Sequence, residues 1–179
     1  YSQTFFDGMK KEGIENPLNL VRCAWAGSQR YGALVWSGDV PSTFTYLRYQ
    51  LTAGLNMGLA GIAWWTADIG GFHGGNVHDP AFHELLMRWF QFGAFCPVMR
   101  LHGNRNRHGE KSNLKEPSGD PNELWSFGER IFEILKKLVF LRERLRPYIE
   151  HHMKIASEKG YPVMRPMFFD FPDDKELSL

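Results

Sequence analysis

The chain alternates between short, continuous apolar runs and longer segments in which apolar residues recur every three or four positions. Apolar runs cover 19–27, 31–39 and 58–68, and a fourth, at 94–103, contains Pro97, which cannot donate a ladder hydrogen bond. Because apolar and polar residues do not alternate within these runs, they predict strands buried on both faces, as in a parallel sheet.

Two helices are predicted between the strands. From Thr43 to about Met57 the apolar residues have helical spacing. Asp79 is followed by Pro80, which is typical of an N-cap residue with proline in the first helical turn. This pair predicts that a helix begins at "AFHELLMRWFQF".

Two further helices are predicted toward the C-terminus. Asp120-Pro121 repeats the N-cap pattern, and Glu123, three residues after Asp120, completes a capping box. The pattern predicts a long helix that begins there and runs through Leu145. Pro147 separates it from a last helix that runs to Gly160, and the tail "VMRPMFFDFPDD" is expected to lead into an extended segment.

The order of these elements predicts an α/β fold with about four parallel strands and covering helices. Such a set is either half of a (β/α)8 barrel or a small open sheet. An open sheet usually carries a phosphate-binding loop, but the best candidate, "GGFHGG" at 70–75, matches neither G-x-G-x-x-G nor a loop ending in GK[ST]. The half-barrel is therefore favoured. The polar segment 103–119 is expected to be a long surface connection.

Composition and charge exclude several classes of protein. Of the 179 residues, 43% are hydrophobic and 15% aromatic, which is too apolar for a disordered tail. With 21 basic and 20 acidic residues the net charge is +1, so no nucleic-acid or membrane partner is expected. No apolar run approaches the roughly 20 residues needed to span a bilayer. The chain opens on Tyr1 without a signal peptide, so we expect its natural N-terminus to lie elsewhere.

The cysteines and histidines do not indicate a metal site. Cys23 and Cys96 lie in apolar or aromatic surroundings, which predicts two reduced, buried thiols. The seven histidines form no HExxH motif, and no Cys-x-x-Cys pair is present. We therefore expect neither a metal nor another cofactor.

Polar residues mark the predicted strands. One lies within or at the end of each strand: Arg22, Asp39, Asp68 and His102. In a (β/α)8 barrel the loops after the strands form the active-site face, so these side chains should converge, with Trp36, Trp65 and Phe72 beside them. Carboxylates that grip hydroxyls and flat rings that stack on C–H faces suit a sugar. From the residues alone, the alternative that these are unrelated, solvent-facing turn residues stays open.

Four segments together resemble glycoside hydrolase family 31. They are "WSGDVPST" (36–43), "WWTADIGGF" (64–72), "RLHG" (100–103) and "RPMFFDFPDD" (165–174), in the family's order. The nearest likeness is to bacterial retaining α-glucosidases and α-xylosidases. The resemblance implies the second half of a (β/α)8 TIM barrel, with 1–174 as a partial catalytic domain and 175–179 as a truncated tail.

The resemblance also implies roles for the predicted site. Asp39 takes the position of the general acid/base, and its partner is a carbohydrate substrate. The positions that line the subsite for the terminal sugar are those of Arg22, Trp36, Asp68, Phe72 and His102. A retaining glycosidase needs a second carboxylate about 5 Å from the acid/base, as the nucleophile.

The nucleophile of the family is absent. No segment like W-x-D-x-x-E precedes Arg22, and Asp7 lies in a polar, helix-like context. We therefore expect a piece of a longer enzyme that is inactive alone and self-associates through open sheet edges. The alternative is a noncatalytic sugar-binding module or a pseudoenzyme. The motifs do not separate glucose from xylose, or a hydrolase from a lyase or transglycosylase.

Overall fold

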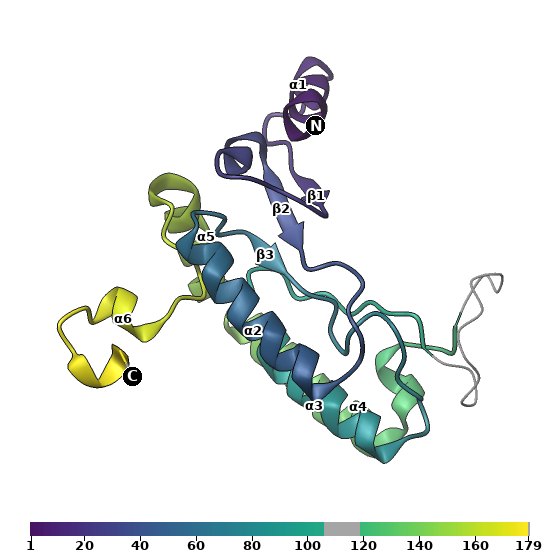
Figure 1. Ribbon diagram of the computed structural model, residues 1–179. Coiled ribbons are helices and arrows are strands. Elements are labelled where there is room, and N and C mark those ends of the chain that lie inside the picture. The colour runs from purple at the N-terminus through teal and green to yellow at the C-terminus, as the bar shows by residue number, and fades with distance from the viewer. Residues whose placement is uncertain (106–118, 179) are drawn as a thin grey trace.

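The computed structural model describes residues 1–105 and 119–178 (Figure 1). The chain has an α/β fold with a small parallel sheet against which helices pack. Strand β1 spans Asn19–Val21, β2 spans Ala33–Trp36 and β3 spans Trp65–Thr66. They pair in the order β1-β2-β3, and both pairings are parallel.

The helices have the following bounds: α1 Ser2–Lys11, α2 Phe44–Leu59, α3 Pro80–Gly93, α4 Glu129–Arg144, α5 Arg146–Lys159 and α6 Met167–Asp170. Short 3-10 helices lie at Ser28–Tyr31, Leu124–Phe127 and Lys175–Ser178. In Figure 1, α2, α3 and α4 run side by side, and the segment that carries α6 extends away from them. Helix α2 also packs against β3, where Gly54 permits close approach, because a Cβ on it would lie 2.9 Å from the Trp65 ring.

The strands are shorter than the apolar runs that predicted them. Strand β2 ends at Trp36 because Gly38, two residues later, has a φ of +81° and turns the backbone out of the extended region. Strand β3 then loses its neighbour, so its ladder ends at Thr66. Residues 62–64 lead into the sheet without belonging to β3.

The prediction of four strands is not confirmed, because residues 1–105 and 119–178 contain three. The apolar residues 94–96 end α3 in turns and do not begin a strand. Pro97 follows and has no N–H for a ladder. Farther on, Leu101 and Ile69 form one isolated parallel bridge, which places this segment next to the residues that follow β3.

Two helix starts are confirmed. Thr43 is the N-cap of α2, where its hydroxyl accepts a hydrogen bond from the Tyr46 N–H at 3.2 Å. Asp79 is the N-cap of α3, where its carboxylate accepts from the Ala81 N–H at 2.9 Å and Pro80 occupies the first turn. Both caps satisfy backbone donors that a helix leaves open at its start.

The helix start predicted at Asp120 is wrong. Asp120 forms an antiparallel bridge with Arg105, so its backbone is committed to an extended pairing. The Glu123 carboxylate accepts from the Ser126 hydroxyl at 2.8 Å, at the start of a 3-10 turn. Gly128, with a φ of +85°, breaks that turn, and α4 begins one residue later. The C-terminal segment is also less extended than expected, because it contains α6.

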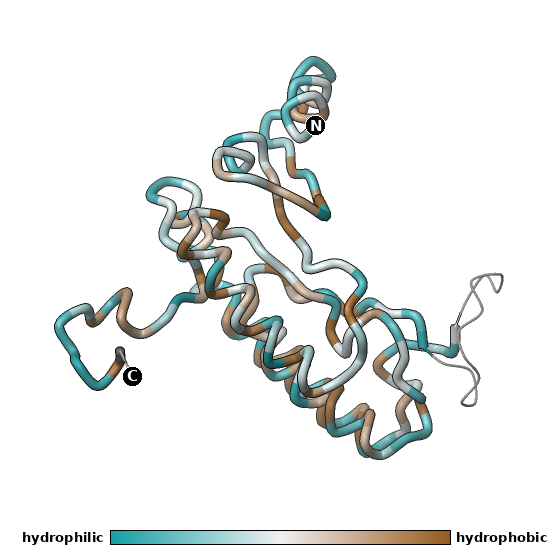
Figure 2. The backbone as a smooth tube through the Cα atoms, viewed as in Figure 1, coloured by the Kyte–Doolittle hydropathy of each residue, from teal (hydrophilic) through white to brown (hydrophobic). Residues whose placement is uncertain are grey.

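The core consists of two clusters of buried side chains. The larger joins α3 and α4 to the segment after β3, and its members Leu86, Trp89 and Leu135 are completely buried. The smaller lies around the sheet and includes Trp65 and Cys96. Figure 2 shows the corresponding alternation of apolar and polar positions along the helices.

One of the two cysteines differs from its prediction. Cys96 is buried, and burial raises the pKa of its thiol to about 12. Cys23 is exposed, because it lies beyond the end of β1, on a segment that leaves the sheet. Both thiols are free.

We expect Leu135→Ala to lower the free energy of unfolding by about 2–5 kcal/mol, because it opens a cavity at a fully buried site. Val139→Ala on the same helix is the control, since Val139 is 39% exposed and loses fewer contacts. Urea unfolding followed by circular dichroism measures both. Equal losses for the two variants would contradict this account of the core.

Candidate active site

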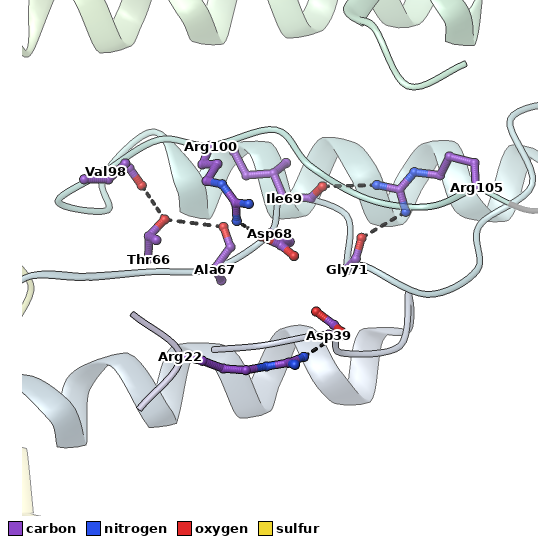
Figure 3. A network of polar contacts seen from close by, with 10 residues as sticks. All are labelled: Arg22, Asp39, Thr66, Ala67, Asp68, Ile69, Gly71, Val98, Arg100 and Arg105. Atoms are coloured by element: carbon purple, nitrogen blue, oxygen red, sulfur yellow. Dashed lines mark hydrogen bonds and ion pairs between the residues drawn. The ribbon is translucent and has the colours of Figure 1, made fainter. Parts of the chain in front are cut away.

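Three of the predicted polar residues, Arg22, Asp39 and Asp68, follow strands whose carboxyl ends meet at one edge of the sheet (Figure 3). Arg22 directly follows β1, and was wrongly predicted to lie within that strand. Asp39 lies three residues after β2, and Asp68 lies two residues after β3. His102 follows the isolated bridge at Leu101.

Arg22 and Asp39 form an ion pair at the surface. The Nη2 atom of Arg22 lies 2.5 Å from Oδ2 of Asp39, and the two side chains are 58% and 33% exposed. The contact holds the carboxylate in one orientation while leaving it open to solvent. The Arg22 guanidinium also lies over the Trp36 ring, 5.4 Å from its centroid, so the indole packs against the ion pair through a cation–π contact.

Asp68 is completely buried behind this pair. Its Oδ1 atom contacts Nη1 of Arg100 (Figure 3). Burial raises the pKa of Asp68, against the opposing effects of the positive charges of Arg100 and His102, while the Asp39 charge adds to the rise. A charged carboxylate at a fully buried position destabilises the fold unless its oxygens accept hydrogen bonds or pair with a cation.

Two buried polar atoms of the site make no hydrogen bond with the described residues. Oδ2 of Asp68, an acceptor, and Nε1 of Trp36, a donor, have no hydrogen-bond partner among the described residues. Buried polar atoms are nearly always paired in folded proteins, so such exceptions call for an explanation. A ligand rich in hydroxyl groups could pair with both atoms, because each hydroxyl donates and accepts.

Phe72 and His102 add a wall of rings. Their centroids lie 5.4 Å apart with the planes tilted by 36°. Phe72 is half-buried, and His102 is exposed. Such rings offer flat apolar faces beside the polar groups.

Contacts and charge interactions connect all six predicted residues. The series runs from Asp39 to Arg22, Trp36, Arg100, Asp68, His102 and Phe72. Arg100 belongs to it and was missed as a site residue. Its signal was a charged residue at the end of an apolar run, at the position where a buried carboxylate from another strand needs a counter-charge.

A second unpredicted arginine, Arg105, contacts the loop after β3. Arg105 is 1% exposed, and burial lowers the pKa of its guanidinium to about 10, although the Asp68 charge opposes this. It therefore carries its charge at neutral pH. It donates to backbone carbonyls of Ile69 and Gly71, in the loop after β3 (Figure 3).

A cavity of about 610 Å³ lies elsewhere, at the opposite ends of the strands. Its walls include Phe6 and Lys10 of α1, Gly32 before β2, and Ser157 of α5. None of the predicted site residues lines it. The arrangement of charges and open polar atoms, and not this cavity, identifies the candidate site.

Within the described ranges, no group of three or more His, Cys, Asp or Glu side chains is arranged to hold a metal ion. Within the same ranges, no helix is both long and apolar enough to cross a membrane.

Residues 1–151 match the family model described as the glycosyl hydrolases family 31 TIM-barrel domain. The chain belongs to glycoside hydrolase family 31. Among solved structures, the α-xylosidase of this family from a soil metagenome, complexed with xylose, superposes with a TM-score of 0.92 at 58% identity. That alignment covers 99% of this chain and 27% of the α-xylosidase chain.

Curated relatives of the family point the same way. The α-xylosidase of Saccharolobus solfataricus is 36% identical over 176 residues, which is 98% of this chain and 22% of that protein. An uncharacterized family 31 glucosidase of Pseudescherichia vulneris is 69% identical over 105 residues, which is 59% of this chain and 20% of that protein. The alignments thus span 20–27% of the length of these three family 31 proteins.

Proposed function

We propose that this chain is the acid/base-bearing second half of the catalytic barrel of a retaining α-glycosidase, which releases terminal α-linked glucose or xylose. One observation carries the proposal. The solvent-accessible carboxylate of Asp39 lies in the same site as two buried polar atoms, on Asp68 and Trp36, that have no hydrogen-bond partner among the described residues. The xylosidases and glucosidases among its relatives support the substrate class.

Asp39 serves as the general acid and then the general base. Its 33% exposure lets a substrate reach it, and Arg22 fixes its direction. For the first step Asp39 is protonated and no longer forms an ion pair with Arg22; its proton passes to the glycosidic oxygen as the bond to the anomeric carbon breaks, and the carboxylate that remains pairs with Arg22 again. In the second step it accepts a proton from the water that attacks the glycosyl-enzyme bond.

The nucleophile comes from a segment outside this chain. Asp68 lies near Asp39, but it is completely buried and held by Arg100. Its Oδ1 is committed to the Arg100 guanidinium and only Oδ2 is left to accept a hydrogen bond, so we assign Asp68 to sugar binding and not to the nucleophile. Asp7 lies on α1, a helix that packs against β1 and the 3-10 turn at Ser28–Tyr31, so it does not supply the second carboxylate either.

The buried groups bind the terminal sugar. Oδ2 of Asp68 accepts a hydrogen bond from one sugar hydroxyl, and Nε1 of Trp36 donates one to another, which pairs both open atoms. Phe72 and His102 form a side wall of this subsite. Arg100 compensates the Asp68 charge, so the subsite stays neutral enough for an uncharged ligand.

An assay of the longer protein that contains this chain tests the proposal. We expect it to hydrolyse an aryl α-glucoside or α-xyloside and to release the α-anomer first, as seen by NMR. Release of the β-anomer would contradict the retaining mechanism. Sugar binding without hydrolysis would favour the alternative of a noncatalytic sugar-binding module or pseudoenzyme.

The 179-residue chain alone should be inactive toward the same substrates and should self-associate. Within the described part of the chain, β1 pairs only with β2, so its other edge is open, and Leu20 and Trp25 beside it are exposed. Light scattering measures the mass, and Leu20→Glu is expected to reduce association. A monodisperse 20.7 kDa monomer would contradict the prediction of self-association.

A further inference from the structure

We propose that Arg105 is a positioning residue of this active site. Its guanidinium fixes the loop after β3, which carries Asp68 and Phe72, against the loop after β2, which carries Asp39. The inference rests on the proposed function, because it concerns the geometry of the same site.

Among residues 1–105 and 119–178, the contacts of Arg105 come from three segments. Its acceptors there are all neutral oxygens: Gly71 O at 3.0 Å, Ser42 Oγ at 3.1 Å, Gly74 O at 3.2 Å and Gly70 O at 3.4 Å from Nη1; Ile69 O at 3.3 Å from Nη2; and Asn122 Oδ1 at 2.7 Å from Nε. A guanidinium carries five N–H donors on three nitrogens in a rigid plane, so it reaches acceptors on several sides, whereas the three donors of a lysine ammonium radiate from one nitrogen.

The backbone around the guanidinium leaves no spare room. A Cβ on Gly103 would lie 2.5 Å from Nη2 of Arg105, and one on Gly70 would lie 2.9 Å from the same atom. The Cζ atom of the guanidinium lies 4.8 Å from the centroid of the Phe82 ring. A side chain at either glycine would therefore collide with the guanidinium, and Arg105 is only 1% exposed.

The two loops that Arg105 joins are also linked by their backbones. The N–H groups of Phe72 and His73 both donate to Val40 O, at 2.7 and 3.1 Å, and the Ser42 N–H donates to His73 O at 2.9 Å. Val40 directly follows Asp39 in the chain. A shift of the loop after β3 therefore moves the acid/base as well.

Arg105 donates hydrogen bonds to residues that are sequence neighbours of the proposed sugar-binding residues. It holds the carbonyl of Ile69, directly after Asp68, and that of Gly71, directly before Phe72. Misplacing reacting groups by about 1 Å can cost roughly 100-fold in rate. We expect loss of the guanidinium to lower kcat/KM by about 10- to 100-fold, with a higher KM.

The test uses Arg105→Ala, Arg105→Lys and Ser42→Ala in the full-length protein. Arg88→Ala is the control, because Arg88 is an exposed arginine of α3 that pairs with Glu84. Active sites are titrated with a slowly hydrolysed fluorinated glycosyl fluoride, so that kcat and KM refer to competent molecules. Millimolar guanidinium should restore part of the activity of Arg105→Ala, while sodium chloride at the same ionic strength should not.

A merely structural role predicts fewer titrated sites with unchanged kcat and KM per site, and that result would overturn the inference. If Arg105→Ala does not fold, the kcat and KM per titrated site of Arg105→Lys and Ser42→Ala test the inference in its place. Ser42→Ala removes one acceptor and keeps the guanidinium, so its loss should be the smallest of the three.

Affinity for free xylose and glucose, read from tryptophan fluorescence, separates the two proposals. A wild-type protein that binds sugar without hydrolysing it would contradict the proposed function. The inference about Arg105 would then be judged by affinity, which should fall in the Arg105 variants and stay constant in Arg88→Ala. Unchanged affinity in all the variants would overturn it.

Discussion

Replacing Asp39 by Asn in the full-length protein is expected to lower kcat for an unactivated α-linked disaccharide by about 10²–10⁴-fold. The amide cannot give a proton to the departing oxygen and cannot take one from water. Asn is nearly the same size as Asp, and the side chain is partly exposed, so the variant should fold. Its melting temperature and circular dichroism spectrum check this directly.

The loss should depend on the leaving group. An aryl glycoside with an acidic phenol needs little protonation, so glycosylation of the Asp39→Asn enzyme by it should be slowed much less. Asp7→Asn, an exposed carboxylate on α1, is the matched control and should leave kcat unchanged. Wild-type rates of Asp39→Asn on the disaccharide would remove Asp39 from the acid/base role.

Asp68→Asn is expected to lower kcat/KM by roughly 10- to 150-fold, since a hydrogen bond to a charged group contributes about 1.5–3 kcal/mol. The variant removes the carboxylate that we propose as the acceptor of a sugar hydroxyl, and it leaves the Arg100 guanidinium without its counter-charge. Most of the loss should appear in KM if the hydroxyl contact forms already in the ground state, and in kcat if it strengthens in the transition state.

Asp170→Asn is the control for this prediction, because Asp170 also accepts from an arginine, Arg165, but near the C-terminus. It should leave kcat/KM unchanged. His102→Ala should show a smaller loss than Asp68→Asn, because His102 is exposed and its lost contacts can be replaced by water. An Asp68→Asn enzyme with the kcat/KM of the wild type would exclude the ligand role of Asp68.

The grouping of the site was predictable from the sequence because parallel strands place their carboxyl ends together. Asp39 and Asp68 follow neighbouring strands, and that alone brings them to one edge. The length of each strand was not predictable from apolar runs. The turn at Gly38 ended two ladders at once, and the run at 94–96 belonged to the end of α3.

The two missed arginines have a different cause. Arg100 lies near the end of the predicted fourth strand and Arg105 in the predicted surface connection, yet they balance or bind groups from other segments. Their roles depend on tertiary contacts with Asp68 and Gly71, and no local pattern encodes those contacts. Asp120 was misassigned for the same reason, because its pairing with Arg105 overrides a good capping sequence.

We propose Asp39 as the acid/base of a retaining enzyme whose nucleophile lies on another segment. The most direct measurement uses Asp39→Ala in the full-length protein, an aryl α-glycoside with a good leaving group, and azide. With Asp39 absent, the covalent glycosyl-enzyme still forms but water attacks it slowly, and azide, which needs no base, should take its place. The account predicts faster turnover in azide and an α-glycosyl azide as the NMR-identified product. A β-glycosyl azide would show that Asp39 is the nucleophile, and would contradict the account.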